Sequence, residues 1–235
     1  MNIPYPPEHY YQNQGMVPNT GPVECVTTSV VIVMNMMKDR LAYDLNRPAI
    51  LDIHVRDYVK KLNGMGMCGL RYRFPSNFPF IAMRGWMLPV LQAPLALKQF
   101  ASELKHIYGC SFKVKQTSGN TLEDITQALQ DGNFVLVHGL WVVTDTKEIH
   151  YKFGGIPHTM LPVEIDSLND KVRLLNPAEP NPGRIDPNDP ATYPAAELDE
   201  MPTEEFLAFW GRKSFLNLYT RPFTMTVVIP DTKTK

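Results

Sequence analysis

The feature that most constrains the fold is a nearly continuous apolar run from Val26 to Met37. Local preferences within this run are divided, because the four residues Val30–Val33 would suit a β-strand. The run is longer than a strand of a compact domain normally is, however, and it ends in a polar segment. It therefore predicts a helix from Cys25 to about Lys38 that is buried on nearly all sides.

Cys25 stands at the start of this predicted helix, behind the polar turn Asn19–Pro22. Unpaired backbone N–H groups and the helix dipole stabilise a thiolate at such a position, so Cys25 is a candidate nucleophile. A free cysteine is also a common small core residue, and this remains the alternative interpretation. Four other residues favour the nucleophile, and they are Gln12, Gln14, His158 and Asn176.

The composition is that of an ordinary globular protein. The chain has 235 residues, of which 44% are hydrophobic and 20% charged, which fits one large domain or two small ones. The formal net charge is −1 and no basic block is present, so we expect neither a nucleic acid nor a membrane as partner. The first residues lack the features of a secretory signal, which predicts a cytoplasmic protein, or one released by a route without a signal.

Three cysteines are too few for a disulfide framework, and they form no Cys-x-x-Cys pair for zinc. Cys68 lies in a glycine-rich segment and Cys110 in a predicted turn, and we expect both to be structural. The sequence implies no metal and no cofactor.

Predicted helices come first along the chain and predicted strands second. Residues 1–22 are expected to form an extended arm. The predicted helices are 25–38, 50–62, 95–108, 122–129 and 203–210, and the predicted strands are 111–115, 134–143, 159–165, 172–175 and 223–229, with a proline-rich loop over 177–202. This order predicts a single α+β domain over 1–235, in which a mainly helical half, 1–130, packs on an antiparallel sheet formed by the half 131–235.

The strands before and after residue 167 form a predicted hairpin. A three-residue loop, Ser167–Asn169, with Asn169 in the left-handed conformation, would place Asp166 opposite Asp170 and Asn176 opposite Met160. His158 and Asn176 would then lie on one face as a diagonal pair, with backbones roughly 7–8 Å apart. A two-residue turn would instead place them on opposite faces.

This arrangement matches the needs of a nucleophilic thiol. The thiol requires a base, and the base requires a third group that fixes its tautomer; His158 and Asn176 are the candidates. The developing oxyanion needs donors, for which we assign the Cys25 N–H and a glutamine amide. We prefer Gln14, which precedes a glycine, while Gln12 stays open as the alternative.

Two other histidines compete with His158 for the role of base, namely His138 and His150. His158 is preferred because it opens an apolar strand ahead of a hairpin that ends in Asn176-Pro177. His138 lies within a predicted core strand, where a hydrogen-bonded structural histidine is the more ordinary interpretation.

The chain also resembles a known group of proteins. Ile3-Pro4-Tyr5, the segment Gly21–Ser29 around Cys25, a histidine opening an apolar strand, and Leu-Leu-Asn176-Pro177 are similar to papain-fold cysteine peptidases of the double-glycine leader peptidase type and their peptidase-like relatives. The resemblance covers roughly residues 1–40 and 132–229. It implies Cys25 as nucleophile, His158 as base, Asn176 as orienting residue and a glutamine in the oxyanion hole. Val26 stands where that group usually has glycine.

Together, these features predict a cysteine peptidase or amidase that hydrolyses a peptide or related amide through a thioester. The same residues would also serve an acyltransferase, a transpeptidase or a cell-wall hydrolase. The alternative of another class is an inactive papain-like binding module. The substrate and the oligomeric state are left open by the sequence.

Overall fold

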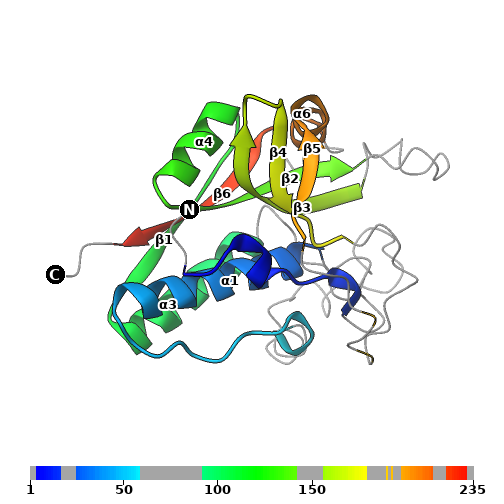
Figure 1. Ribbon diagram of the computed structural model, residues 1–235. Helices are drawn as coiled ribbons and strands as arrows, with labels where there is room; N and C mark the ends of the chain where they lie inside the picture. The colour runs from blue at the N-terminus through cyan, green and yellow to red at the C-terminus, as the bar shows by residue number, and fades with distance from the viewer. Residues whose placement is uncertain are drawn as a thin grey trace, which may run out of the picture.

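A computed structural model describes residues 4–16, 25–58, 92–141, 156–178, 189, 192, 197–213 and 221–231. A six-stranded sheet lies at the centre, in the order β1-β6-β2-β3-β4-β5, and all of its neighbouring strands are antiparallel (Figure 1). The strands are β1 (Ser111–Thr117), β2 (Phe134–Trp141), β3 (Ile156–Asp166), β4 (Lys171–Leu175), β5 (Asp199–Pro202) and β6 (Thr224–Asp231). The helices are α1 (Cys25–Asp44), α3 (Gln92–Tyr108), α4 (Leu122–Gln130) and α6 (Thr203–Trp210), with two 3-10 turns, η1 (Pro7–Tyr10) and η2 (Gln14–Met16).

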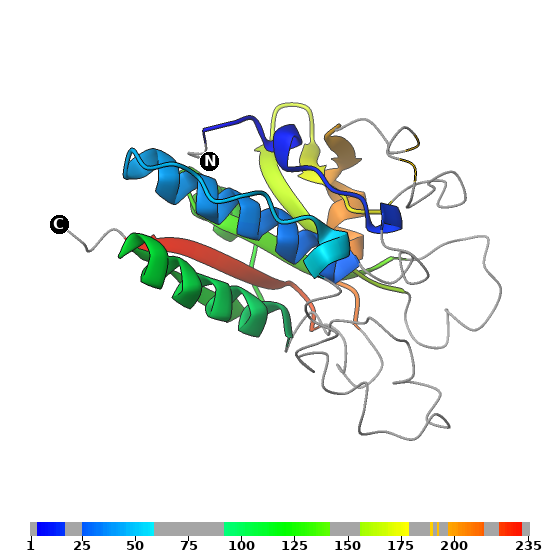
Figure 2. The ribbon, with the colours of Figure 1, turned by 90° about the horizontal axis from the view of Figure 1, so that it is seen from below.

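Helices cover both faces of the sheet. Helices α1 and α3 lie on one face, and α4 and α6 lie on the other (Figures 1 and 2). Side chains alternate along the strands, so β2 sends Phe134 and Leu136 toward α1 and α3, and Val135 and Val137 toward α4 and α6. The protein is therefore an α+β fold of mixed helices and antiparallel sheet.

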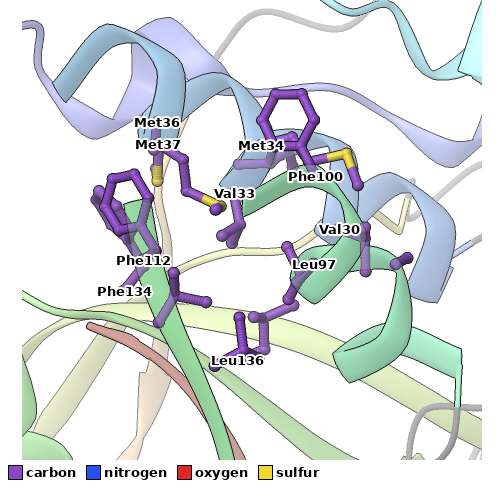
Figure 3. Packing of buried hydrophobic residues seen from close by; sticks show 14 of the residues in the cluster. Val30, Val33, Met34, Met36, Met37, Leu97, Phe100, Phe112, Phe134 and Leu136 are labelled. Atoms are coloured by element: carbon purple, nitrogen blue, oxygen red, sulfur yellow. The ribbon is translucent and has the colours of Figure 1, made fainter. Parts of the chain in front are cut away.

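The predicted buried helix is confirmed as α1, which continues beyond the predicted end to Asp44. The side chains from Val30 to Val33 are fully buried, although β-branched residues favour strands when packing does not decide. Figure 3 shows the reason: α1 residues such as Val33 and Met36 pack among side chains of α3 and of the sheet, including Leu97 and Phe134. Burial outweighs the local strand preference of this segment.

Both ends of α3 and of α4 follow from local chemistry. Gly109 has a φ of 78° directly after α3, and Gly132 has a φ of 76° shortly after α4, a conformation that glycine adopts without strain. Thr121 and Asp124 form a capping box at the start of α4. Helix α3 begins at Gln92, earlier than predicted, because Pro94 is tolerated in the first helical turn.

The sheet draws on both parts of the chain. Strand β1 precedes residue 130 but pairs with β6, and α4 packs on the face opposite to α1. Two elements of the expected helical half therefore do not follow the predicted division: β1 is part of the sheet, and α4 does not lie in the layer of α1 and α3. The proline-rich loop also differs from the prediction, because β5 lies within it and pairs with β4; residues 179–188 lie outside the described part of the chain.

The predicted helix 50–62 is wrong at its start. Residues 50–54 are not helical, whereas residues 55–58 are, and the rest of that range lies outside the described residues. The Asn35 carboxamide of α1 bonds both the N–H and the C=O of Ile53, at 2.9 and 2.8 Å. The buried Lys38 amine also pairs with Asp52, at 2.6 Å. These tertiary bonds hold the backbone out of a helical conformation, which a propensity argument could not anticipate.

The hairpin between β3 and β4 differs from the prediction at its turn but not at its far end. The turn has four residues, 167–170, because Asp166 pairs with Lys171, and Asp170 takes the left-handed conformation in place of Asn169. A bulge between Pro162 and Glu164 then shifts the register by one residue, so that Leu161 lies opposite Leu175 as predicted. The bulge compensates for the longer turn.

Candidate active site

His158 and Asn176 lie in direct contact. The two come from β3 and from the end of β4, and His158 Nε2 lies 2.8 Å from Asn176 Oδ1. The backbone N–H of Ala178 also donates to Oδ1, at 3.0 Å, which identifies this atom as the carboxamide oxygen. Because that oxygen only accepts hydrogen bonds, the neutral imidazole carries its hydrogen on Nε2. Nδ1 therefore has the lone pair that a general base needs.

The surroundings of His158 keep it neutral. The residue is 6% exposed, and burial lowers its pKa to about 4, although the bond to Asn176 acts in the opposite direction. The ring of Phe209 from α6 lies edge-on to the imidazole, with centroids 6.3 Å apart. Charging the ring is unfavourable in this apolar setting.

Gly139 of β2 makes the approach of Phe209 possible. It pairs with His158 in the sheet, and a Cβ at position 139 would lie 2.6 Å from Phe209 atoms. Sequence reasoning missed this pair. The signal was present, since a glycine within an apolar strand indicates close approach of another group.

Cys25 is the first residue of α1 and is buried. The hydroxyl of Ser29, one helical turn further along, donates to the carbonyl oxygen of Thr159 at 3.0 Å, and Thr159 directly follows His158. The first turns of α1 therefore contact the start of β3, and Figure 1 shows both toward the same end of the molecule. Ser29 and Thr159 were not singled out by the sequence, although the spacing of four from Cys25 indicates a shared helix face.

The two candidate glutamines differ in their environment. Gln12 is bound at both ends of its carboxamide: Nε2 donates to Ile53 O and Oε1 accepts from Val55 N–H, each at 2.7 Å. Gln14 starts η2, and its backbone N–H donates to Pro177 O at 2.9 Å. The arm thus joins the segment that directly follows Asn176, with Gln14 at the junction.

One of the two competing histidines, His138, is a structural residue. His138 is fully buried, and its two ring nitrogens lie 3.0 and 2.9 Å from the hydroxyls of Thr159 and Thr226. This matches the expected hydrogen-bonded histidine on a core strand. Burial lowers its pKa to about 3. His150 and Cys68 lie outside the described residues.

Neither a metal site nor a membrane span is found in the described ranges. No group of three or more His, Cys, Asp or Glu side chains there could hold a metal ion. None of the helices in the same ranges has the length and apolar character that crossing a membrane requires.

No family model matches this chain, and no curated protein matches it at a significant level. One similar solved structure is described as that of a candidate C39-like peptidase from Bacillus anthracis. It aligns over 88% of this chain and 88% of its own, with 11% sequence identity and a TM-score of 0.44.

Proposed function

We propose that the protein is a papain-like cysteine peptidase or amidase, with Cys25 as nucleophile, His158 as base and Asn176 as the orienting residue. The observation that carries this proposal is the His158–Asn176 hydrogen bond, at 2.8 Å, beside the first turns of α1. A carboxamide that holds Nε2–H directs the basic nitrogen, Nδ1, away from Asn176. This is the tautomer that a thiol partner needs.

The reaction proceeds in two acyl-transfer steps. The Cys25 thiol gives its proton to Nδ1 of His158, and the sulfur attacks the carbonyl carbon of the amide. The tetrahedral intermediate collapses to a thioester as the imidazolium protonates the departing amine. Water, deprotonated by His158, then attacks the thioester and releases the acid and the thiol.

Cys25 and His158 pack against different helical layers. Cys25 belongs to the α1 layer, whereas the ring of His158 contacts Phe209 of α6. The paired residues of β3 and β4 end at Leu161 and Leu175, so the start of β3 is not flanked by β4. We propose that Cys25 Sγ reaches Nδ1 past this end of β4.

The negative charge that develops on the carbonyl oxygen needs donors beside the sulfur. We assign the Cys25 backbone N–H at the helix start and the side-chain amide of Gln14. Gln14 is favoured over Gln12 because the Gln12 carboxamide already bonds the backbone at residues 53 and 55. The backbone bond from Gln14 to Pro177 O places the start of η2 next to the Asn176 segment.

The test is to compare the three cysteines as single alanine variants. Cys25→Ala should remove hydrolysis of a peptide library and labelling by a thiol-directed acyl-enzyme probe, while Cys68→Ala and Cys110→Ala should retain both. The pH–rate profile should rise through an acid limb below neutrality, because the base must be unprotonated. Labelling that persists in Cys25→Ala would refute the assignment, and a wild-type protein without hydrolysis would favour the inactive binding module.

A further inference from the structure

Thr159, the neighbour of His158, is held by both its backbone and its side chain. Its carbonyl oxygen accepts a hydrogen bond from Ser29 of α1, at 3.0 Å. Its hydroxyl lies 3.0 Å from Nδ1 of His138 on the neighbouring strand β2. All three side chains are fully buried, so these bonds do not compete with water.

The hydrogen bonds continue across the sheet. Nε2 of His138 lies 2.9 Å from the hydroxyl of Thr226 on β6, which also accepts from the Gln116 amide of β1, at 3.1 Å. Four strands are thereby joined in one polar row beneath α1. Because burial lowers the pKa of His138 to about 3, the ring stays neutral near neutral pH and the row keeps its hydrogen bonds.

Ser29 and Cys25 lie four residues apart on one face of α1. A contact that fixes Ser29 therefore also fixes the part of the helix that carries Cys25. Thr159 and His158 are joined by one peptide bond. The Ser29–Thr159 bond is thus a short mechanical connection between the helix that carries the thiol and the strand that carries the imidazole.

We propose that Ser29, Thr159 and His138 act as positioning residues that set the separation between the Cys25 sulfur and the His158 ring. The inference rests on the proposed function. A displacement of about 1 Å in such a pair can cost roughly 100-fold in rate, so one hydrogen bond between α1 and β3 has a large effect on chemistry.

The experiment measures how the reactivity of Cys25 depends on pH. Full-length variants are alkylated with iodoacetamide from pH 3 to 9, a range that includes the pKa of His158, and modification of the Cys25 peptide is followed by mass spectrometry. Ser29→Ala removes the bond to Thr159. Thr28→Val is the matched control, because Thr28 is its buried neighbour and its hydroxyl has no hydrogen-bond partner in the described structure.

In the wild-type protein and in Thr28→Val, the rate of Cys25 alkylation should rise with a pH midpoint below neutrality, as expected for a thiol paired with an imidazole. In Ser29→Ala the midpoint should move toward the unpaired value of about 8.5, and alkylation at pH 6 should fall at least about 10-fold. Ser29→Thr keeps the hydroxyl and should restore the limb. Thermal unfolding of each variant measures its stability separately. A loss of stability alone would not move the pH midpoint of Cys25 alkylation in the folded protein.

The outcomes distinguish the two proposals. A wild-type midpoint near 8.5 would mean that Cys25 has no paired base, which overturns the proposed function. A wild-type limb below neutrality that persists in Ser29→Ala would overturn the positioning role alone. Thr159→Val, which removes the hydroxyl facing His138 but keeps the carbonyl, is the second variant and should shift the midpoint in the same direction.

Discussion

At the scale of single residues, the site depends on one carboxamide. Asn176 Oδ1 accepts both from the Ala178 N–H and from His158 Nε2, which fixes the side chain and the tautomer of the imidazole together. Burial lowers the pKa of that imidazole, so the neutral base is present near pH 7. A neutral orienting group is sufficient in this setting, because the ring is uncharged in the resting state.

Asn176→Ala should lower kcat by about 100-fold and leave KM nearly unchanged, since the ring loses its orientation while the substrate contacts remain. Steady-state kinetics on the substrate identified by the peptide library provides the measurement. Asn169→Ala, at an exposed turn position of the same hairpin, is the control and should keep wild-type kinetics. Comparable kcat values for the two variants would contradict the orienting role.

At the scale of elements, short irregular segments position the site. A bulge in β3 offsets the four-residue turn and brings Asn176 back to the face of His158. The N-terminal arm is held by two different contacts: the Gln12 side chain bonds the backbone at residues 53 and 55, and the Gln14 N–H bonds Pro177 O. Neighbouring glutamines in the arm therefore differ: the Gln12 side chain is bound to the backbone, whereas Gln14 is bound through its own backbone N–H.

The two glutamines should respond oppositely to alanine. Gln12→Ala leaves the Val55 N–H without its acceptor and should reduce the free energy of unfolding by about 1–3 kcal/mol with kcat little changed. Gln14→Ala removes an oxyanion donor and should lower kcat roughly 100- to 1000-fold with stability little changed. Chemical denaturation and kinetics on both variants provide the comparison, and the reverse pattern would assign the oxyanion role to Gln12.

At the scale of the whole molecule, the sheet lies between two helical layers and buries two histidines in neutral form. His138 faces α1, and His158 contacts α6. Burial lowers their pKa values from 6.5 to about 3 and about 4, respectively. His138 belongs to the hydrogen-bonded row, and His158 belongs to the proposed site. The stability of the fold and the protonation of the proposed base therefore change over the same range of pH.

Stability should therefore fall as the pH drops from about 6.5 to about 4, because the unfolded chain binds protons at both histidines while the folded chain does not. Each histidine contributes up to about 1.4 kcal/mol per pH unit within that range. Urea unfolding at several pH values measures the slope, and His138→Asn should reduce it by the share of one histidine. A free energy of unfolding that stays constant over this range would contradict the burial of neutral imidazoles.

The sequence by itself determined most elements and their local ends. The apolar run after Cys25 was long enough to require a buried helix, Gly109 and Gly132 follow helices that end near them, and α6 was predicted with its observed bounds. The pairing of His158 with Asn176 on one face was also predicted. These features depend on local chemistry and on period, which neighbouring residues encode.

Only the tertiary structure decided how distant segments meet. The placement of β1 beside β6, the non-helical backbone at residues 50–54, and the contact of Phe209 with His158 beside Gly139 all depend on partners far away in the chain. The hairpin illustrates the difference: its turn was predicted wrongly, yet its far end was right, because a bulge restored the register. Packing of both faces of the sheet against helices selects that register, since a one-residue slip would move each apolar side chain of β3 from its own core to the opposite one.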